Sequence, residues 1–166
     1  MDTPVIDFHT HMGRWGAVSV DDSPARVLRV MDEAGIDKAC VNCIFYGDAR
    51  HGNDLAAEYV ARHPDRFLGV AYVTPRYPDE AVPELERCFD QIGAKFLKIY
   101  PSYAQRPIDD EVWAPIFDWC DGRGVAVMSH STFSHNDRPK GYRKLSDRFP
   151  NVKWVAAHAA GGTDRH

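Results

Sequence analysis

Pro4-Val-Ile-Asp-Phe-His-Thr-His11 is the stretch of the chain that decides the fold. It begins as an apolar run with β-branched and aromatic residues, as buried parallel strands do, and it ends in two histidines. A doubly wound nucleotide-binding sheet usually has a glycine-rich turn after its first strand, whereas a (β/α)8 barrel carries its chemistry at the carboxyl ends of its strands. The histidines therefore favour the barrel. Without a G-x-G-x-x-G motif or a P-loop lysine in the sequence, a nucleotide-binding module is a weak alternative.

The same kind of run recurs along the chain and alternates with stretches of helical length. Strands are predicted at residues 4–8, 39–45, 67–73, 95–100, 124–129 and 152–157. Helices are predicted at 25–34 with the cap Ser23, at 54–63 with the cap Asn53, at 78–92, from Asp109 or Asp110 to Gly122, and at 140–149. Helices of this length between short strands are typical of βαβ units and a parallel sheet.

The length of the repeat bears on how much of a barrel is present. The five repeats between Pro4 and Val152 take about 30 residues each, and the 166-residue chain begins a sixth. Two further units and a sixth helix would add roughly 75 to 80 residues and bring the total to about 245, close to the ~250 of a typical barrel. We therefore interpret residues 1–166 as a single α/β domain of the (β/α)8 TIM-barrel type, truncated after the sixth strand and incomplete at its C-terminus.

Composition excludes several classes of function. With 20 basic and 24 acidic residues and a formal charge of -4, the chain is not expected to bind nucleic acid. It has no apolar run of the roughly 18 to 20 residues needed to cross a membrane, and its first ten residues do not resemble a signal peptide, so we expect a cytoplasmic protein with reduced cysteines. Cys40 and Cys43 have zinc-site spacing but lie on a predicted strand, where residues three apart face opposite sides. The open strand edges of an incomplete barrel leave a homo-oligomer as an alternative to a monomer.

Four of the eight histidines follow predicted strands. His9 and His11 are two apart on an extended segment, which puts both side chains on one side with Cα atoms about 6.5 to 7 Å apart. His130 and His158 follow the fifth and sixth strands, so the carboxyl ends of the strands would bring nitrogen ligands together for zinc or another late first-row ion. Lys98, on the fourth strand, is either paired, modified or functional inside the barrel, or packs its stem outward and snorkels.

The motifs at these strands resemble those of the amidohydrolase superfamily, specifically its amidohydrolase-related branch. The resemblance rests on Val-Ile-Asp-Phe-His-Thr-His-Met-Gly at the first strand, Leu-Lys-Ile-Tyr-Pro at the fourth, Val-Met-Ser-His at the fifth and Val-Ala-Ala-His-Ala-Ala-Gly-Gly at the sixth. It implies that His9, His11 and His130 are metal ligands and that His158 orients or protonates the reacting group. Lys98 matches a lysine that is carbamylated in binuclear members, but this branch is commonly mononuclear.

The resemblance also implies an aspartate after an eighth strand, and Asp164 lies too close to His158 to be that residue. The branch contains hydrolases, lactonases and non-oxidative decarboxylases. We therefore expect a metal-dependent hydrolase of a small-molecule amide, ester or lactone. The alternatives are a decarboxylase of an aromatic or unsaturated acid and an inactive fragment with residual metal binding. The expected ion is zinc, with manganese or iron as alternatives. Arg14, Lys98 and Tyr100 are candidates for binding an acidic substrate.

Overall fold

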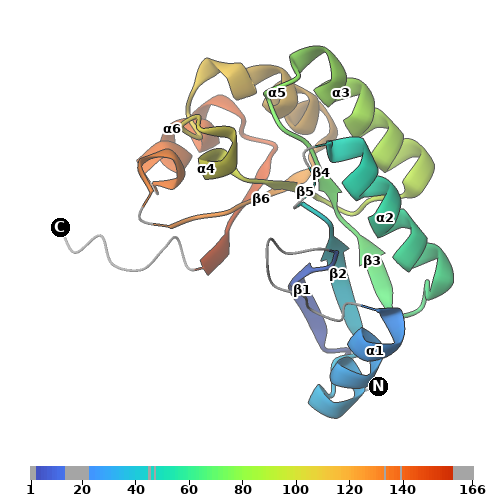
Figure 1. The fold of residues 1–166 in the computed structure, drawn as a ribbon. Helices are drawn as coiled ribbons and strands as arrows, with labels where there is room; N and C mark the ends of the chain where they lie inside the picture. Colours follow the sequence, from blue (N-terminus) through green and yellow to red (C-terminus); the bar gives the residue numbers. More distant parts are fainter. Residues whose placement is uncertain are drawn as a thin grey trace. The chain divides into compact units, whose positions relative to one another are not determined.

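The computed structural model describes residues 3–13, 23–44, 46, 48–132, 134–138 and 140–158. These residues form two compact units, the first within Met1–Tyr72 and Cys88–Lys95 and the second within Val73–Arg87 and Phe96–His166. Each unit combines parallel strands with helices, as predicted, and Figure 1 traces both.

The first unit contains a parallel sheet in the order β1 (Ile6–His11), β2 (Lys38–Asn42) and β3 (Phe67–Gly69). A short strand, β4 (Ala71–Tyr72), follows β3. The unit also contains the helices α1 (Pro24–Ala34) and α2 (Ala49–Arg62) and the π-helical turn η1 (Cys88–Ile92), and α2 packs along β2 and β3 (Figure 1). Its core is formed by Met12, Met31, Ala39, Val41, Cys43, Ala56 and Phe67.

Helix α1 confirms the signals that predict it. The Ser23 hydroxyl accepts a hydrogen bond from the backbone N–H of Arg26 at 3.4 Å, and Pro24 occupies the first turn, where no N–H is needed. Gly35 ends the helix with φ +68°, a left-handed conformation that costs glycine little. Local capping chemistry therefore fixes both ends of this helix.

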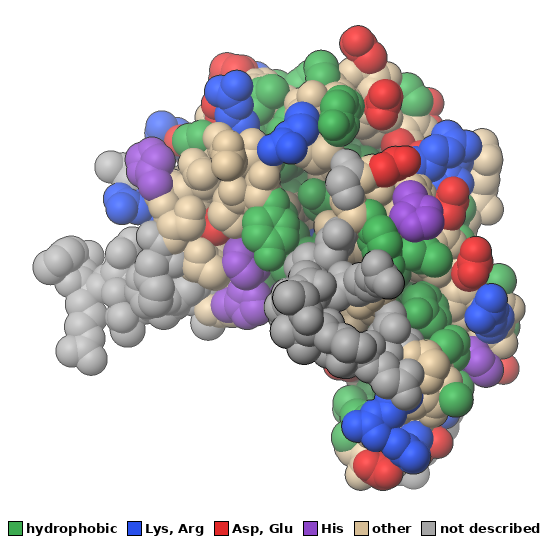
Figure 2. Space-filling model, viewed as in Figure 1, with side chains coloured by type: hydrophobic (Ala, Val, Ile, Leu, Met, Phe, Trp, Pro, Cys, Tyr) green, Lys and Arg blue, Asp and Glu red, His purple; other side chains and the backbone are tan. Residues whose placement is uncertain are grey.

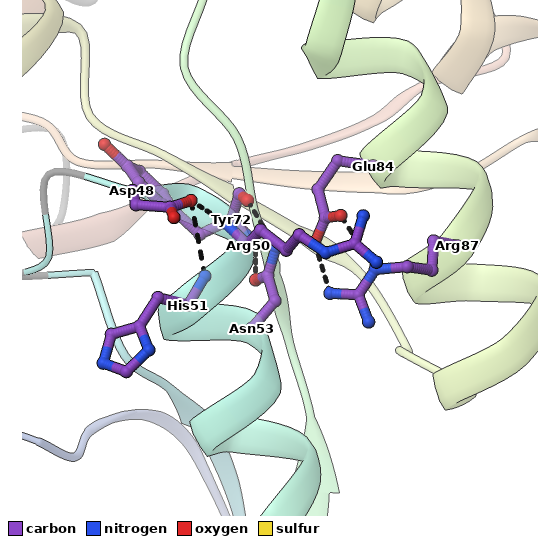
Figure 3. A network of polar contacts seen from close by, with 7 residues as sticks. All are labelled: Asp48, Arg50, His51, Asn53, Tyr72, Glu84 and Arg87. Carbon is purple, nitrogen blue, oxygen red and sulfur yellow. Dashed lines mark hydrogen bonds and ion pairs between the residues drawn. The ribbon is translucent and has the colours of Figure 1, made fainter.

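The cap predicted for the second helix is wrong. Asp48, not Asn53, caps α2, because the Asp48 carboxylate accepts hydrogen bonds from the N–H groups of Arg50 and His51 at 2.9 and 3.4 Å. Asn53 lies one turn inside the helix and is buried, and its amide exchanges two 2.9 Å hydrogen bonds with the backbone of Tyr72 (Figure 3). The side chain therefore ties α2 to β4 instead of starting the helix.

The second unit contains a parallel sheet in which β5 (Leu97–Ile99), β6 (Ala126–Ser129) and β7 (Lys153–Ala156) are neighbours in that order. Its helices are α3 (Pro78–Arg87), α4 (Pro101–Ala104), α5 (Ala114–Arg123) and α6 (Lys140–Arg148), with 3-10 turns η2 (Glu111–Trp113) and η3 (His135–Asp137). Helix α3 packs on α5, and on α3 Glu84 and Arg87 form a two-pronged ion pair at 2.7 and 2.8 Å (Figure 3).

Several details differ from the prediction. Strand β1 is predicted at residues 4–8 but runs to His11, so His9 and His11 lie within the strand and do not follow it. The run 67–73 forms two short strands instead of one, and the N–H of Val70 between them bonds to the carbonyl of Val41 at 3.0 Å. The predicted helix 78–92 is α-helical only to Arg87 and continues as η1. The turns α4 and η3, which the sequence does not predict, lie in the loops after β5 and β6.

The surface charges and the state of the cysteines match what the composition predicts. On the face drawn in Figure 2, Lys and Arg side chains are interspersed with Asp and Glu. None of the described helices is long and apolar enough to span a membrane. All four cysteines are buried thiols, and burial raises the pKa of Cys40 to about 11 and that of Cys120 to about 12. Burial thus disfavours the thiolate form that zinc binds.

Candidate metal and catalytic site

His9 and His11 lie together at the carboxyl end of β1. Their ring centroids are 4.8 Å apart and their planes meet at 71°. The pairing of β1 with β2 shifts register between Asp7 and Thr10, so a local irregularity in the strand lies at this histidine pair. The prediction that the two side chains share one side of an extended segment is confirmed by this geometry.

Asn42, at the end of β2, holds His11 in place. The Nδ1 atom of His11 lies 2.9 Å from Oδ1 of Asn42, and the Asn42 amide donates to the carbonyl of Thr10 at 3.1 Å. Because the amide nitrogen makes that second bond, Oδ1 faces His11 as an acceptor, and Nδ1 must carry the ring proton. The lone pair of His11 is then on Nε2, which is the arrangement that a metal ligand needs. Asn42 is buried, and the polar residue at a strand end is the sequence signal that could have identified it.

The second unit holds an aromatic cluster at the ends of β5, β6 and β7. The ring of Tyr100 is stacked on those of His130 and Tyr103, with centroids 4.4 and 4.7 Å apart. Nε2 of His158 lies 3.2 Å from Nδ1 of His130. His158 has φ +57°, a left-handed conformation that is uncommon outside glycine. Two histidines predicted at the ends of neighbouring strands are therefore in direct contact.

Lys98, in the middle of β5, is fully buried and does not snorkel to solvent. Its ammonium nitrogen lies 4.8 Å from the centre of the Tyr100 ring and has no hydrogen-bond partner among the residues that the structure describes. Burial lowers the pKa of Lys98 to about 7, and the charge of Asp137 opposes that change. An ammonium in this setting is suited to an anionic partner.

Asp137, which the sequence analysis does not identify, is the fully buried acid of this cluster. Its carboxylate accepts hydrogen bonds from the N–H of Ser102 at 2.9 Å and from the hydroxyl of Thr132 at 3.1 Å. Burial raises the pKa of Asp137, while these hydrogen bonds lower it. The residue thereby joins η3 to α4, and its position inside an unpredicted 3-10 turn gives no periodic signal in the sequence.

The histidines of the two units can be compared as candidate metal ligands. The two imidazoles of β1, with His11 held in the right tautomer, fit the nitrogen donors that a late first-row ion prefers. Among the described residues, no three His, Cys, Asp or Glu side chains gather into one group. His9 and His11 belong to the first unit, and His130 and His158 to the second. Arg14, a candidate for binding substrate, lies outside the described residues.

Comparison with known proteins identifies relatives of the chain. Residues 6–165 match the model of a protein family described as Amidohydrolase. A 2-amino-3-carboxymuconate-6-semialdehyde decarboxylase of Dictyostelium discoideum is 30% identical over 82 residues, which are 49% of this chain and 23% of that protein. A gamma-resorcylate decarboxylase of Rhizobium radiobacter is 49% identical over 45 residues, which are 27% of this chain and 14% of that protein. The matches therefore span less than a quarter of these curated relatives.

Solved structures share the fold over most of the chain. A TIM-barrel protein of Bordetella bronchiseptica has a TM-score of 0.71 at 17% identity, covering 93% of this chain and 66% of its own. A dihydroxybenzoic acid decarboxylase of Polaromonas sp. JS666, solved with bound manganese and an inhibitor, has a TM-score of 0.69 at 21% identity, covering 93% of this chain and 65% of its own. The predicted TIM-barrel type of fold is thereby confirmed, and the chain spans about two thirds of these solved chains.

Proposed function

The chain belongs to the amidohydrolase family, and on that premise we propose that the protein is a metal-dependent decarboxylase of an aromatic or unsaturated carboxylic acid. The observation that carries the choice of reaction is the name of the curated relatives, which are decarboxylases of such acids. The buried ammonium of Lys98 supports it, because a carboxylate substrate suits that cation better than a neutral amide or ester does.

In this proposal His9, His11 and His130 hold the ion. His11 is prepared for this role by its hydrogen bond to Asn42, and His130 is held by its stacking on Tyr100. A bound divalent ion supplies positive charge that fixes and polarises oxygen atoms of the substrate. Zinc is the first candidate. Manganese, present in the related Polaromonas structure, and iron also suit histidine ligands.

The protein's own residues bind the acid and move a proton. Lys98, Tyr100 and Arg14 are proposed to face the acidic substrate. His158 is proposed to donate the proton. The bond between the substrate carbon and its carboxylate breaks, carbon dioxide leaves, and the electron pair that stays on the carbon takes a proton from the imidazolium of His158. Nε2 of His158 lies 3.2 Å from Nδ1 of His130, so Nδ1 of His158 is the ring nitrogen left to face the substrate.

A hydrolase is the second candidate, favoured by the description of the family whose model matches the chain. The same residues would serve it. Water polarised by a bound ion would be the nucleophile, and His158 would stabilise the oxyanion or pass a proton. A neutral amide, ester or lactone would then take the place of the carboxylic acid.

The test measures metal and turnover on the same sample. The protein is loaded separately with zinc and manganese, its metal content is measured, and carbon dioxide release is followed with 2,6-dihydroxybenzoate and unsaturated dicarboxylic acids. Ester, lactone and amide panels run in parallel. Decarboxylation that is lost in His158→Asn and kept in His51→Asn supports the proposal. Turnover of the ester, lactone or amide panel alone favours the hydrolase, and bound metal without turnover of any panel favours an inactive fragment.

A further inference from the structure

A cavity of about 340 Å³ lies in the second unit, apart from the aromatic cluster. It is lined by Pro75, Arg76, Ala104, Gln105, Arg106 and Val112. Pro75 and Arg76 lie in the segment that leads from β4 to α3, and Ala104, Gln105 and Arg106 lie at the end of α4, after β5. Both segments follow the carboxyl ends of parallel strands, the end at which barrel proteins bind their ligands.

The lining of this cavity carries two arginines, Arg76 and Arg106. Among the described residues, no carboxylate lies within ion-pair distance of the Arg76 guanidinium, and the Arg76 side chain is exposed. The Nη1 of Arg106 lies 3.8 Å from the Asp110 carboxylate, a loose ion pair, and the Arg106 side chain is 60% exposed. Two arginines therefore line one cavity with one distant acid, in a chain of net charge -4.

The backbone that carries Gln105 and Arg106 is held in place. Gln105 is left-handed, with φ +56° and ψ +36°, and its N–H donates to the carbonyl of Ser102 at 3.2 Å. The N–H of Arg106 donates to the carbonyl of Pro101 at 3.2 Å. These two hydrogen bonds end α4, and they place the side chains of Gln105 and Arg106 on one short turn. A side chain whose backbone is already fixed loses less freedom when a ligand binds.

We propose that Arg76, Gln105 and Arg106 form a binding site for an oxyanion, either a carboxylate or a phosphate. The planar guanidinium offers paired N–H donors that match the two oxygens of such a group. The glutamine amide adds a neutral donor of the kind that orients a ligand.

The position of α4 indicates how this anion relates to the aromatic cluster. Tyr103, one residue before the cavity-lining Ala104, stacks on Tyr100, which stacks on His130. The anion site and His130 are therefore joined through one short helix. We assign the anion to a second acidic group of the substrate, and this assignment, unlike the site itself, rests on the proposed decarboxylase function.

The site is tested with inorganic phosphate and succinate as probes. Each is titrated into the protein while the amide NMR signals of Gln105 and Arg106 are followed. We expect saturable shifts with a millimolar Kd, weakened at least about tenfold in Arg76→Gln and in Arg106→Gln. The matched control is Arg62→Gln on α2, whose arginine pairs with Glu58 at 3.4 Å, and its Kd should equal that of the unmodified protein. Absent shifts with both probes up to tens of millimolar, or equal weakening in all three variants, would overturn the proposal.

A second arm identifies the source of the anion. Competitive inhibition of decarboxylation by succinate or phosphate, lost in Arg76→Gln, supports a second acidic group of the substrate. Saturable binding without inhibition supports the site and overturns its assignment to the substrate, leaving a separate anionic ligand. Saturable binding in a protein that decarboxylates no acid counts against the proposed function and leaves the anion site standing, so the two failures are distinguishable.

Discussion

The ring of Tyr100 lies parallel to the ring of His130, with 4.4 Å between the centroids and 16° between the planes. This contact restrains the plane of the His130 imidazole, as does its contact with His158. The orientation of a candidate metal ligand therefore depends on an aromatic neighbour. Lys98, 4.8 Å from the centre of the Tyr100 ring, adds a cation to the same stack.

Replacing the ring of Tyr100 should weaken metal binding. Tyr100→Leu removes the stacking surface, and we expect metal affinity to fall about tenfold or more, as when other partners of metal-bound histidines are lost. Tyr100→Phe keeps the ring and should retain the affinity. Competition with a chelator measures both variants, and the urea midpoint records their stability. If Tyr100→Leu lowers only the midpoint, the ring supports packing and does not orient His130.

The buried charge of Lys98 should make stability depend on pH. Because its pKa is lowered from 10.5 to about 7, the unfolded chain binds one proton more than the folded chain between those values. Stability therefore rises with pH in that window, and the penalty for the buried charge is fully present below about pH 7. We expect the unmodified protein to gain ~2 kcal/mol relative to Lys98→Met between pH 7.5 and 9.

Urea unfolding of both proteins at several pH values measures this difference. Asp137 and Tyr100 both act on the Lys98 ammonium, and neither is replaced in the comparison. Lys144→Met serves as the control, since the Lys144 amine is an exposed surface partner of Asp109. Parallel pH dependences of the unmodified protein and Lys98→Met would contradict a lowered pKa.

Replacing two helical glycines by alanine should change the stability of the fold in opposite directions. A Cβ at Gly52 of α2 would lie 2.1 Å from the carbonyl oxygen of Cys43, a backbone atom that cannot move aside locally. Gly52→Ala is expected to destabilise the fold by about 3 kcal/mol. A Cβ at Gly122 of α5 meets nothing within 4 Å, so Gly122→Ala should stabilise by about 0.5 to 1 kcal/mol. Thermal or urea unfolding compares the pair, and equal effects would show that α2 does not approach Cys43 so closely.

The sequence predicts the elements whose signals are local. The proline and glycine at the two ends of α1, and the apolar, β-branched composition of the strands, are signals within a few residues, and the structure agrees with them. Asn53 shows where this reasoning fails. Its residue type favours a helix cap, but its amide reaches Tyr72, nineteen positions away, and that contact cannot be read from neighbours in the sequence. The contact with Tyr72 determines the role of Asn53, and Asp48 caps the helix.

In the candidate site, too, residues with local signals could be predicted and residues that depend on distant partners could not. The histidines could be predicted because each lies at or just beyond the carboxyl end of a strand. Asn42 and Asp137 could not, because their roles depend on partners across the fold, Asn42 on His11 and Asp137 on Ser102. For Lys98 the sequence left burial and snorkelling open, and only the packing of β5 distinguishes them.

Asn42 should control the proton of His11, and this prediction can be checked without metal. Its carbonyl accepts from Nδ1 at 2.9 Å while its amide donates to Thr10. In Asn42→Leu both partners lose their bond, so the His11 ring should populate both tautomers and metal affinity should fall 10- to 100-fold. Asn42→Asp retains an acceptor and should keep the proton on Nδ1. Asn151→Leu, in which an amide that bonds to Asp121 is lost, is the matched control and should leave both measurements unchanged.

Nitrogen NMR shifts of the His11 ring in the metal-free protein report the tautomer, and chelator competition reports the affinity. Together, the two measurements distinguish the orientation of the His11 ring from its binding to the ion. A mixed tautomer with unchanged affinity would mean that His11 is held by Asn42 but does not bind the ion. A ring that keeps its proton on Nδ1 in Asn42→Leu would mean that another group sets the tautomer, and the hydrogen bond between the ends of β1 and β2 would then serve only to join the two strands.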